Sequence, residues 1–131
     1  GGDGIRSCVE SVVSPLGQIW QSAEGAEVCL LRKRVLNVLN LVVTAIGCEN
    51  TSQLDPLVMP MLAVATNPQV AASDYVMEDG LELWSTIMAN TTAYTADLHN
   101  LFPNIHPILA RDLEFLQVCM GLVESYVVLG A

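Results

Sequence analysis

Leu54-Asp55-Pro56-Leu57-Val58-Met59-Pro60-Met61-Leu62 is one of three apolar segments in this chain with a proline at the same place. Residues 9–16 and 101–109 are the other two, and Pro15, Pro60 and Pro107 are separated by 45 and 47 residues. A period in this range is typical of HEAT repeats, each a pair of antiparallel helices. The spacing therefore predicts a helical solenoid that recognises partners over a long surface. The alternative is three unrelated apolar helices whose prolines coincide by chance.

The chain is unusually apolar for its size. Of its 131 residues, 52% are hydrophobic and 15% are charged, and its mean hydropathy is +0.46. Soluble domains normally carry more charge, whereas a solenoid repeat without its neighbour exposes an apolar face. We therefore expect a fragment of a longer superhelix, which could self-associate through its exposed terminal repeats.

Insertion into a membrane is the obvious competing explanation of this composition. Residues 35–47 form an apolar run directly after Arg32-Lys33-Arg34. The run contains two asparagines and is shorter than the about 20 apolar residues that a bilayer requires. The N-terminus lacks the pattern of a secretory signal. We expect no membrane insertion.

The balance of charge argues against nucleic acid as a partner. The formal net charge is −9, and phosphate recognition needs clustered Lys and Arg. The one basic cluster, Arg32-Lys33-Arg34, is interpreted as an exposed helix face, with a localisation signal or a partner-binding patch as the alternatives. An acidic solenoid is instead suited to basic partners.

Helix breakers and apolar periodicity predict an all-α chain. Steps of three and four between apolar residues indicate amphipathic helices, and no strand pattern is evident. We expect a right-handed α-solenoid of about three HEAT repeats, namely 5–47, 52–90 and 95–130. The first helix of each pair carries the repeat proline and is expected on the convex side; the second would line the concave face. The expected helical segments are about 5–22, 27–46, 54–66, 76–89, 95–111 and 112–129.

Several single residues carry local expectations. Pro15 should kink the first helix, and Gly80, unfavourable inside a helix, should permit a close contact. Thr95 is expected to cap the fifth segment. The other expected caps are Gly47, Thr51 or Ser52, and Asp112.

The run Tyr75-Val76-Met77-Glu78-Asp79-Gly80-Leu81-Glu82-Leu83-Trp84 resembles a segment in the middle-to-late HEAT repeats of the importin-β (karyopherin) superfamily. A looser, collinear similarity extends over most of the chain. The resemblance implies a nuclear transport receptor that shuttles between cytoplasm and nucleus. Such receptors bind protein cargo, contact Phe-Gly nucleoporins and exchange cargo against Ran-GTP. The principal Ran contacts of the family lie in N-terminal repeats that this chain lacks, so Ran-GTP would bind through the full-length protein.

Five carboxylates are the candidate partner-binding residues. Glu78, Asp79 and Glu82 lie at the start of the fourth segment, and Glu114 and Glu124 would extend the same face by one repeat. They could form an acidic patch that meets basic cargo or Ran. The alternative is that they stabilise a helix N-terminus, where negative charge is favourable.

Apolar slots between outer helices are what Phe-Gly binding would need. The candidates for lining them are Leu16, Trp20, Leu57, Met61 and Phe102, although core packing explains each equally well. Trp84 falls on an apolar stripe and is expected in the core.

The sequence offers no catalytic constellation. His99 and His106 are seven residues apart, wider than a metal-ligand pair on a helix, and we expect no metal or cofactor. Cys8, Cys29, Cys48 and Cys119 adjoin apolar segments and are interpreted as reduced. We expect no enzyme. The alternatives are a HEAT scaffold or regulatory subunit without a link to Ran, and a helical enzyme domain that uses Cys119 or a histidine.

Overall fold

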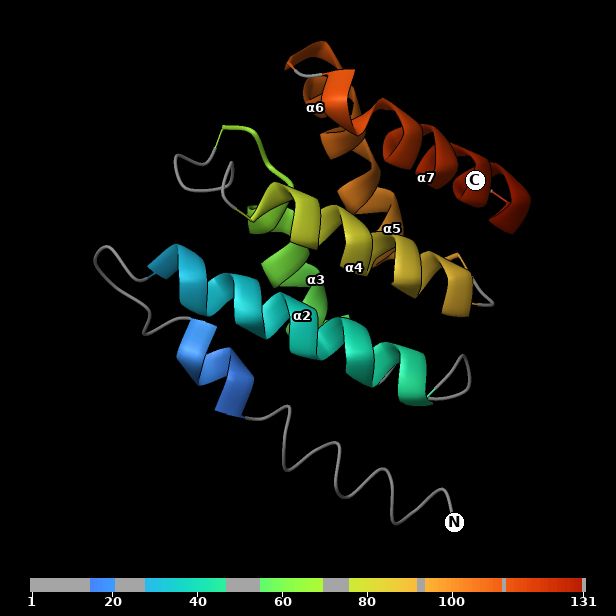
Figure 1. Cartoon of the computed structure of the whole chain (residues 1–131). Coiled ribbons are helices and arrows are strands. Elements are labelled where there is room, and N and C mark those ends of the chain that lie inside the picture. The colour runs from blue at the N-terminus through green and yellow to red at the C-terminus, as the bar shows by residue number, and fades with distance from the viewer. Residues whose placement is uncertain are drawn as a thin grey trace.

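The computed structural model describes residues 15–20, 28–46, 55–69, 76–91, 94–111 and 113–130. Within these ranges the chain is almost entirely helical and contains no strand, which confirms the all-α prediction (Figure 1). A short helix covers residues 15–20. The remaining elements are α2 (Val28–Ile46), α3 (Asp55–Ala65), α4 (Met77–Asn90), α5 (Ala96–Leu101), η4 (Phe102–Asn104), α6 (Ile105–Arg111), η5 (Leu113–Phe115) and α7 (Leu116–Leu129).

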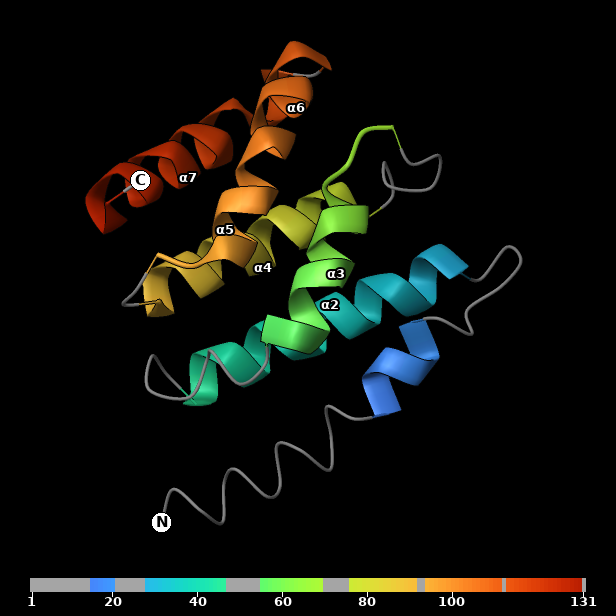
Figure 2. The same cartoon turned by 180° about the vertical axis from the view of Figure 1, so that it is seen from behind.

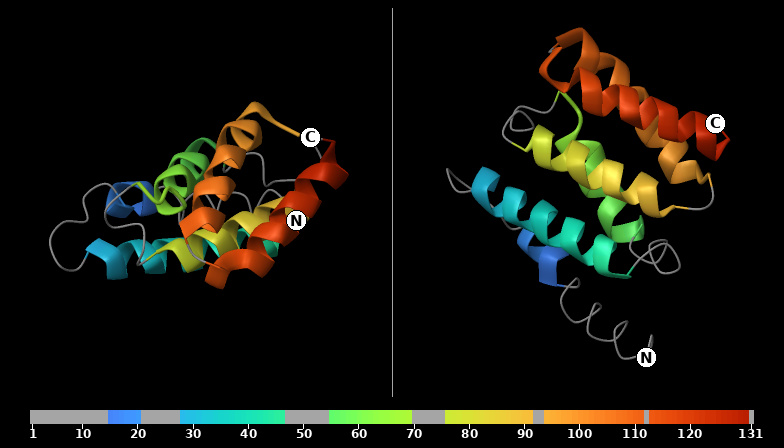
Figure 3. Two further views of the ribbon diagram at one scale, coloured as in Figure 1. Left: turned by 90° about the horizontal axis from the view of Figure 1, so that it is seen from above. Right: turned by 45° about the vertical axis from the view of Figure 1, so that its right-hand side comes forward.

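The helices form two layers. In one layer α2, α4 and α7 lie side by side and run in the same direction, with α4 packed between the other two (Figure 1). The other layer, in front when the molecule is seen from behind, contains residues 15–20, α3, and α5 with α6 (Figure 2). Both layers are seen together from above in Figure 3. Helices that alternate between two layers along the chain are the arrangement of a helical repeat solenoid, as the proline spacing predicted.

Three predicted helices match closely. Segments 27–46, 54–66 and 76–89 correspond to α2, α3 and α4 within a residue. The layering also agrees with the sequence, because the proline-bearing helices occupy one layer and the others the second. The kink predicted at Pro15 and the caps predicted at Gly47, Thr51 or Ser52, and Asp112 depend on residues outside the described part of the chain.

The fifth segment is divided, where the sequence predicted one segment. It consists of α5, the 3₁₀ turn η4 and α6, and Pro103 lies at the start of that turn. Proline has no N–H to donate and its ring clashes with the carbonyl four residues earlier. The start of a new helical turn, where an N–H has no partner within the helix, accommodates it. Thr95 caps α5 as predicted, since its Oγ1 accepts a hydrogen bond of 3.3 Å from the N–H of Leu98.

A buried chain of hydrogen bonds joins α4, α7 and α5 in the core. The indole N–H of Trp84 donates to the hydroxyl of Tyr126 over 3.2 Å, and this hydroxyl donates to the carbonyl of Leu98 over 2.7 Å. The two aromatic rings meet edge to face with centroids 6.1 Å apart. Trp84 is fully buried, as predicted. Burial of the phenol raises the pKa of Tyr126 well above its ordinary value, so the hydroxyl remains a donor.

Gly80 makes the close contact that the sequence predicted. A Cβ at this position would lie 3.0 Å from Cβ of Ala65, the last residue of α3, and 3.2 Å from Cγ2 of Thr66, which follows it. Ala65 and Thr66 are completely buried. The absent side chain therefore lets α4 approach α3 more closely than any other residue would allow.

Several large apolar side chains of the last helix pair are exposed. Leu113, Met120, Val127 and Val128 are exposed there, Val128 by 87%. Self-association through such a face stays a prediction. None of the described helices is long and apolar enough to span a bilayer.

We predict that Gly80→Ala destabilises the fold by about 1–3 kcal/mol, because overpacking against a buried helix outweighs the gain in helix propensity. Gly121→Ala in α7 is the matched control, since its Cβ would meet no atom within 4 Å. The control should stabilise by up to about 1 kcal/mol. Urea unfolding of both variants measures the difference. Equal stabilisation by the two substitutions would show that α3 and α4 are not in close contact.

We predict that Tyr126→Phe costs about 1–3 kcal/mol of unfolding free energy, because it leaves the buried indole N–H of Trp84 without its acceptor. Tyr94→Phe is the control: the Tyr94 hydroxyl bonds Nδ1 of the exposed His99 at 2.8 Å, where water can replace it. Chemical denaturation of both proteins should show the larger loss for Tyr126→Phe. A loss equal to that of the control would contradict the buried hydrogen-bond chain.

Candidate functional site

A groove between α4 and the start of α7 brings together three of the five predicted carboxylates. Glu78, Glu82 and Glu114 border it, and its volume is about 490 Å³. That size lies within the range of about 300–1,000 Å³ found for ligand pockets. The remaining lining residues are Leu81, Ser85, Phe115, Gln117 and Val118.

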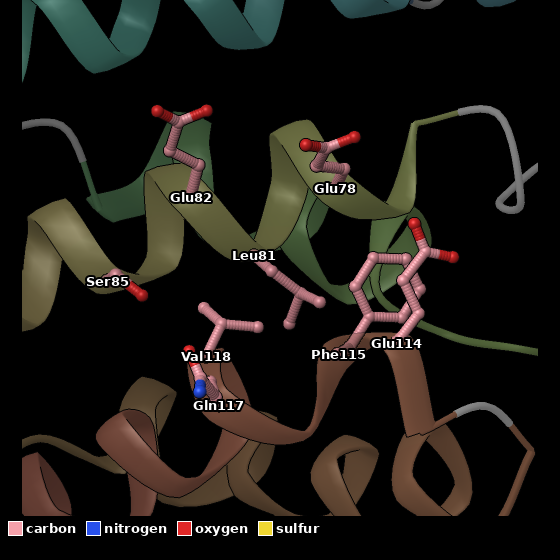
Figure 4. Close-up of a pocket in the computed structure, with 8 residues that line it drawn as sticks. All are labelled: Glu78, Leu81, Glu82, Ser85, Glu114, Phe115, Gln117 and Val118. Carbon is pink, nitrogen blue, oxygen red and sulfur yellow. The ribbon is translucent and has the colours of Figure 1, made fainter.

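The groove has an apolar floor and an acidic border. Leu81 of α4 and Val118 of α7 point toward one another across it, and Phe115 lies beside Glu114 (Figure 4). Glu78 and Glu82 point in the same direction from successive turns of α4 (Figure 4). Neither Lys nor Arg is among the described residues that line it.

Helix geometry explains why these side chains meet. Glu78 and Glu82 are four residues apart and therefore share one face of α4. Glu78 lies in the first turn of α4, and Glu114 in the first turn of η5, directly before α7. Because α4 and α7 run in the same direction, their N-terminal ends lie at the same edge of the layer (Figure 1). The positive ends of two helix dipoles therefore face the carboxylates.

Asp79 is not part of this groove. Its carboxylate is buried and lies 3.8 Å from Nζ of Lys33, a half-exposed residue of α2. Burial raises the pKa of Asp79, while Lys33 and a hydrogen bond from Asn37 act in the opposite direction. Asp79 thus connects α2 with α4, and the sequence did not reveal this because the pair comes from two separate helices.

Glu124 is exposed on α7, away from the residues that line the groove. The five carboxylates consequently do not form one continuous surface. The sequence analysis missed the apolar floor, because nothing in the periodicity of one helix singles out Phe115 and Val118. The signal available was an apolar residue, Leu81, placed between Glu78 and Glu82.

A second hollow lies in the other layer. It has a volume of about 410 Å³ and lies between residues 15–20, α2 and α3. Three of the five predicted slot residues line it, namely Trp20, Leu57 and Met61; Leu16 and Phe102 do not. The guanidinium of Arg32 stacks on the Trp20 ring at 4.6 Å and donates to the Trp20 carbonyl. A Cβ at Gly17 would lie 2.8 Å from Cδ1 of Leu57, so a side chain at this position would displace the end of the Leu57 side chain, which lines the hollow.

The surroundings of Cys119 and His99 bear on the alternative of a helical enzyme domain. Cys119 is completely buried, and this burial raises the pKa of its thiol, which disfavours the nucleophilic thiolate. The Nδ1 of His99 is hydrogen-bonded to the hydroxyl of Tyr94. Within the described ranges, no three His, Cys, Asp or Glu residues are grouped as metal ligands.

Comparison with known proteins gives a family. The family described as "Importin-11-like, TPR repeats" matches residues 33–131, which include most of α2, all of α3 to α7 and the whole groove. The chain belongs to this importin-11-like family. Importin-11 of Mus musculus and of Homo sapiens are each 30% identical to it over 127 residues. The yeast importin beta-like protein KAP120 (Saccharomyces cerevisiae) is 22% identical over 126 residues.

These matches confirm the resemblance to the importin-β superfamily. The importin-11 alignments include 97% of this chain but 13% of the relatives' length, and for KAP120 the values are 92% and 12%. No solved structure matches the chain. The chain therefore spans about an eighth of its importin-11 relatives.

The description of the family names tetratricopeptide repeats, whereas the sequence predicted HEAT repeats. Both are solenoids of helix pairs, so the fold is the same at this level. Prolines 45 and 47 residues apart exceed the about 34-residue period of tetratricopeptide repeats and fit the HEAT period. The repeat class and the repeat boundaries stay predictions.

We predict that Asp79→Asn changes the pH dependence of stability. Since the pKa of Asp79 is raised on folding, the native state binds this proton more tightly than the unfolded chain. The wild type therefore loses stability as the pH rises from the ordinary value near 3.8 through the raised pKa, and the asparagine variant does not. The unfolding free energy of the variant, relative to that of the wild type, should therefore be higher at neutral pH than at acid pH.

Lys33→Met provides the control for this effect. Lys33 lowers the pKa of Asp79, so its removal should raise that pKa further and extend the pH window over which stability falls. If the stability of Asp79→Asn relative to the wild type instead falls toward neutral pH, the ion pair with Lys33 outweighs burial and our assignment is wrong.

Proposed function

We propose that this chain is the partner-binding part of a nuclear transport receptor. The observation that carries the proposal is the match of residues 33–131 to an importin family, over a stretch that folds as a two-layer solenoid. Solenoids of this kind bind partners along extended surfaces rather than in a single deep pocket. The relatives are named importins, and none of the names printed for them is that of an enzyme.

The two layers have different roles in this proposal. Protein cargo binds along the layer formed by α2, α4 and α7, where the acidic groove lies. Phe-Gly nucleoporins contact the other layer, where the hollow beside Trp20 and Gly17 offers an apolar slot. Ran-GTP acts through the full-length protein, and the receptor shuttles between cytoplasm and nucleus. The net charge of −9 supports basic cargo, whose approach it accelerates.

A nucleotide-dependent pull-down tests the proposal. We predict that the full-length receptor that contains this chain binds Ran loaded with GTP and not Ran loaded with GDP. If Ran-GTP and cargo oppose each other's binding, cargo bound beforehand should be released by the GTP form, since such coupling acts equally in both directions. Equal or absent binding of the two forms would leave a helical repeat scaffold without a link to Ran.

A further inference from the structure

The structure separates the three members of the basic cluster Arg32-Lys33-Arg34. The ammonium of Lys33 lies 3.8 Å from the carboxylate of Asp79, and Arg34 is exposed. Arg32 is partly buried and lines the hollow between residues 15–20, α2 and α3, on the side of the molecule that faces the viewer in Figure 2. One cation of the cluster is therefore placed at a cavity.

The guanidinium of Arg32 is held in one orientation. It lies 4.6 Å from the centroid of the Trp20 ring, and its Nε and Nη2 each donate to the Trp20 carbonyl over 3.4 Å. Hydrogen bonds of this length are weak, and a guanidinium carries five N–H groups. Among the described residues, none accepts a hydrogen bond from Nη1 of Arg32 and none pairs a carboxylate with it. The charge is thus oriented by Trp20 but is not neutralised within the described part of the chain.

The rest of the hollow is apolar. Its largest contribution is one face of α3, formed by residues spaced three and four apart, namely Leu57, Pro60, Met61 and Val64. Pro60 is exposed, and Leu57 and Val64 are partly buried, so a ligand can contact this face. No Asp or Glu is among the described residues that line the hollow.

This combination restricts the occupant. A purely apolar ligand would cover the Arg32 charge without a partner, which is unfavourable. A purely anionic ligand would leave the α3 face in contact with water. We propose that the hollow binds an extended protein segment in which an apolar side chain is followed two residues later by an aspartate or glutamate. The apolar side chain packs on α3, and the carboxylate accepts hydrogen bonds from Arg32.

The spacing follows from the geometry of an extended chain. Alternate side chains of such a chain lie on the same side of its backbone, about 6.6 Å apart. An apolar side chain and a carboxylate in this relation can therefore enter one hollow together. Neighbouring side chains point to opposite sides, so one of them would face away.

This assignment rests on the proposed function, because it concerns the slot in which a Phe-Gly segment would bind, and it adds a carboxylate to what that slot selects. The net charge of −9 repels an acidic segment at long range. At about 0.15 M salt, however, interactions between exposed charges are largely screened beyond about 8 Å, whereas a contact with Arg32 is screened much less. The local charge at the hollow therefore decides the preference.

A peptide-binding experiment with the full chain tests this proposal. The probe is a short fluorescently labelled peptide of serine and glycine that contains one Phe-Ser-Asp sequence. A second probe carries asparagine in place of aspartate and is otherwise identical. Fluorescence anisotropy should show that the wild type binds the aspartate probe about three- to tenfold more tightly, as expected for one hydrogen-bonded ion pair. This comparison changes only the peptide, so no variant has to fold.

Two variants show whether Arg32 causes this preference. Arg32→Met keeps an apolar stem that can pack on Trp20 but removes the charge, so it should bind both probes equally. Arg34→Met is the matched control, since it changes the net charge equally at an exposed position of α2 outside the hollow. The control should keep the preference of the wild type. Replacing the phenylalanine of the probe by serine should weaken binding to all three proteins.

The outcomes separate this proposal from the transport function. Equal binding of the two probes by the wild type, equal loss of preference in Arg32→Met and Arg34→Met, or no binding of either probe would overturn the assigned occupant. Binding of a matched Phe-Gly probe as tight as that of the aspartate probe would also overturn it, and would leave the transport function standing. Selective binding of the aspartate probe, together with a full-length receptor that does not bind Ran-GTP, would support the occupant and reject the transport function.

Discussion

The close approach of α4 to α3 at Gly80 is the contact on which the arrangement of this molecule depends. The missing side chain lets the buried Ala65 and Thr66 touch the backbone of α4. With α3 on one side, α4 also packs on α2 and on α7. A helix with neighbours on three sides has only a narrow strip left for solvent, and Glu78 and Glu82 occupy that strip. Their position at the groove is therefore a consequence of packing elsewhere on the same helix.

Periodicity within a helix was enough to predict the helices and much of the core. Helix breakers and apolar patterning placed α2, α3 and α4 within a residue, and the apolar stripe of the fourth segment placed Trp84 in the interior. Prolines marked the layer to which each helix belongs. The periodicity did not predict that Pro103 would interrupt the fifth segment. The apolar pattern continues through this residue, but the helical hydrogen bonding cannot. The break into α5, η4 and α6 follows from this conflict.

The candidate site could be predicted only in part, because its geometry arises between helices. Asp79 is adjacent to Glu78 in the sequence, yet the turn of the helix directs it toward α2, where it meets Lys33. A rule based on one helix treats both as parts of the same acidic face. Phe115 and Val118 become a groove floor only because α7 lies parallel to α4. A single sequence holds no record of that pairing, so the carboxylates were found and the floor beneath them was not.

The helix dipoles explain how a carboxylate cluster can persist without a ligand. Two like charges four residues apart on a helix repel each other by about 0.2–0.5 kcal/mol. Negative charge in the first turn of a helix is stabilised by about 0.3–1 kcal/mol, and Glu78 and Glu114 each occupy such a position. The two effects are of similar size and opposite sign, so the folded chain holds the cluster at little cost. The capping interpretation of these residues and a role in binding are thus compatible, because stabilisation by a helix N-terminus offsets the repulsion within the cluster.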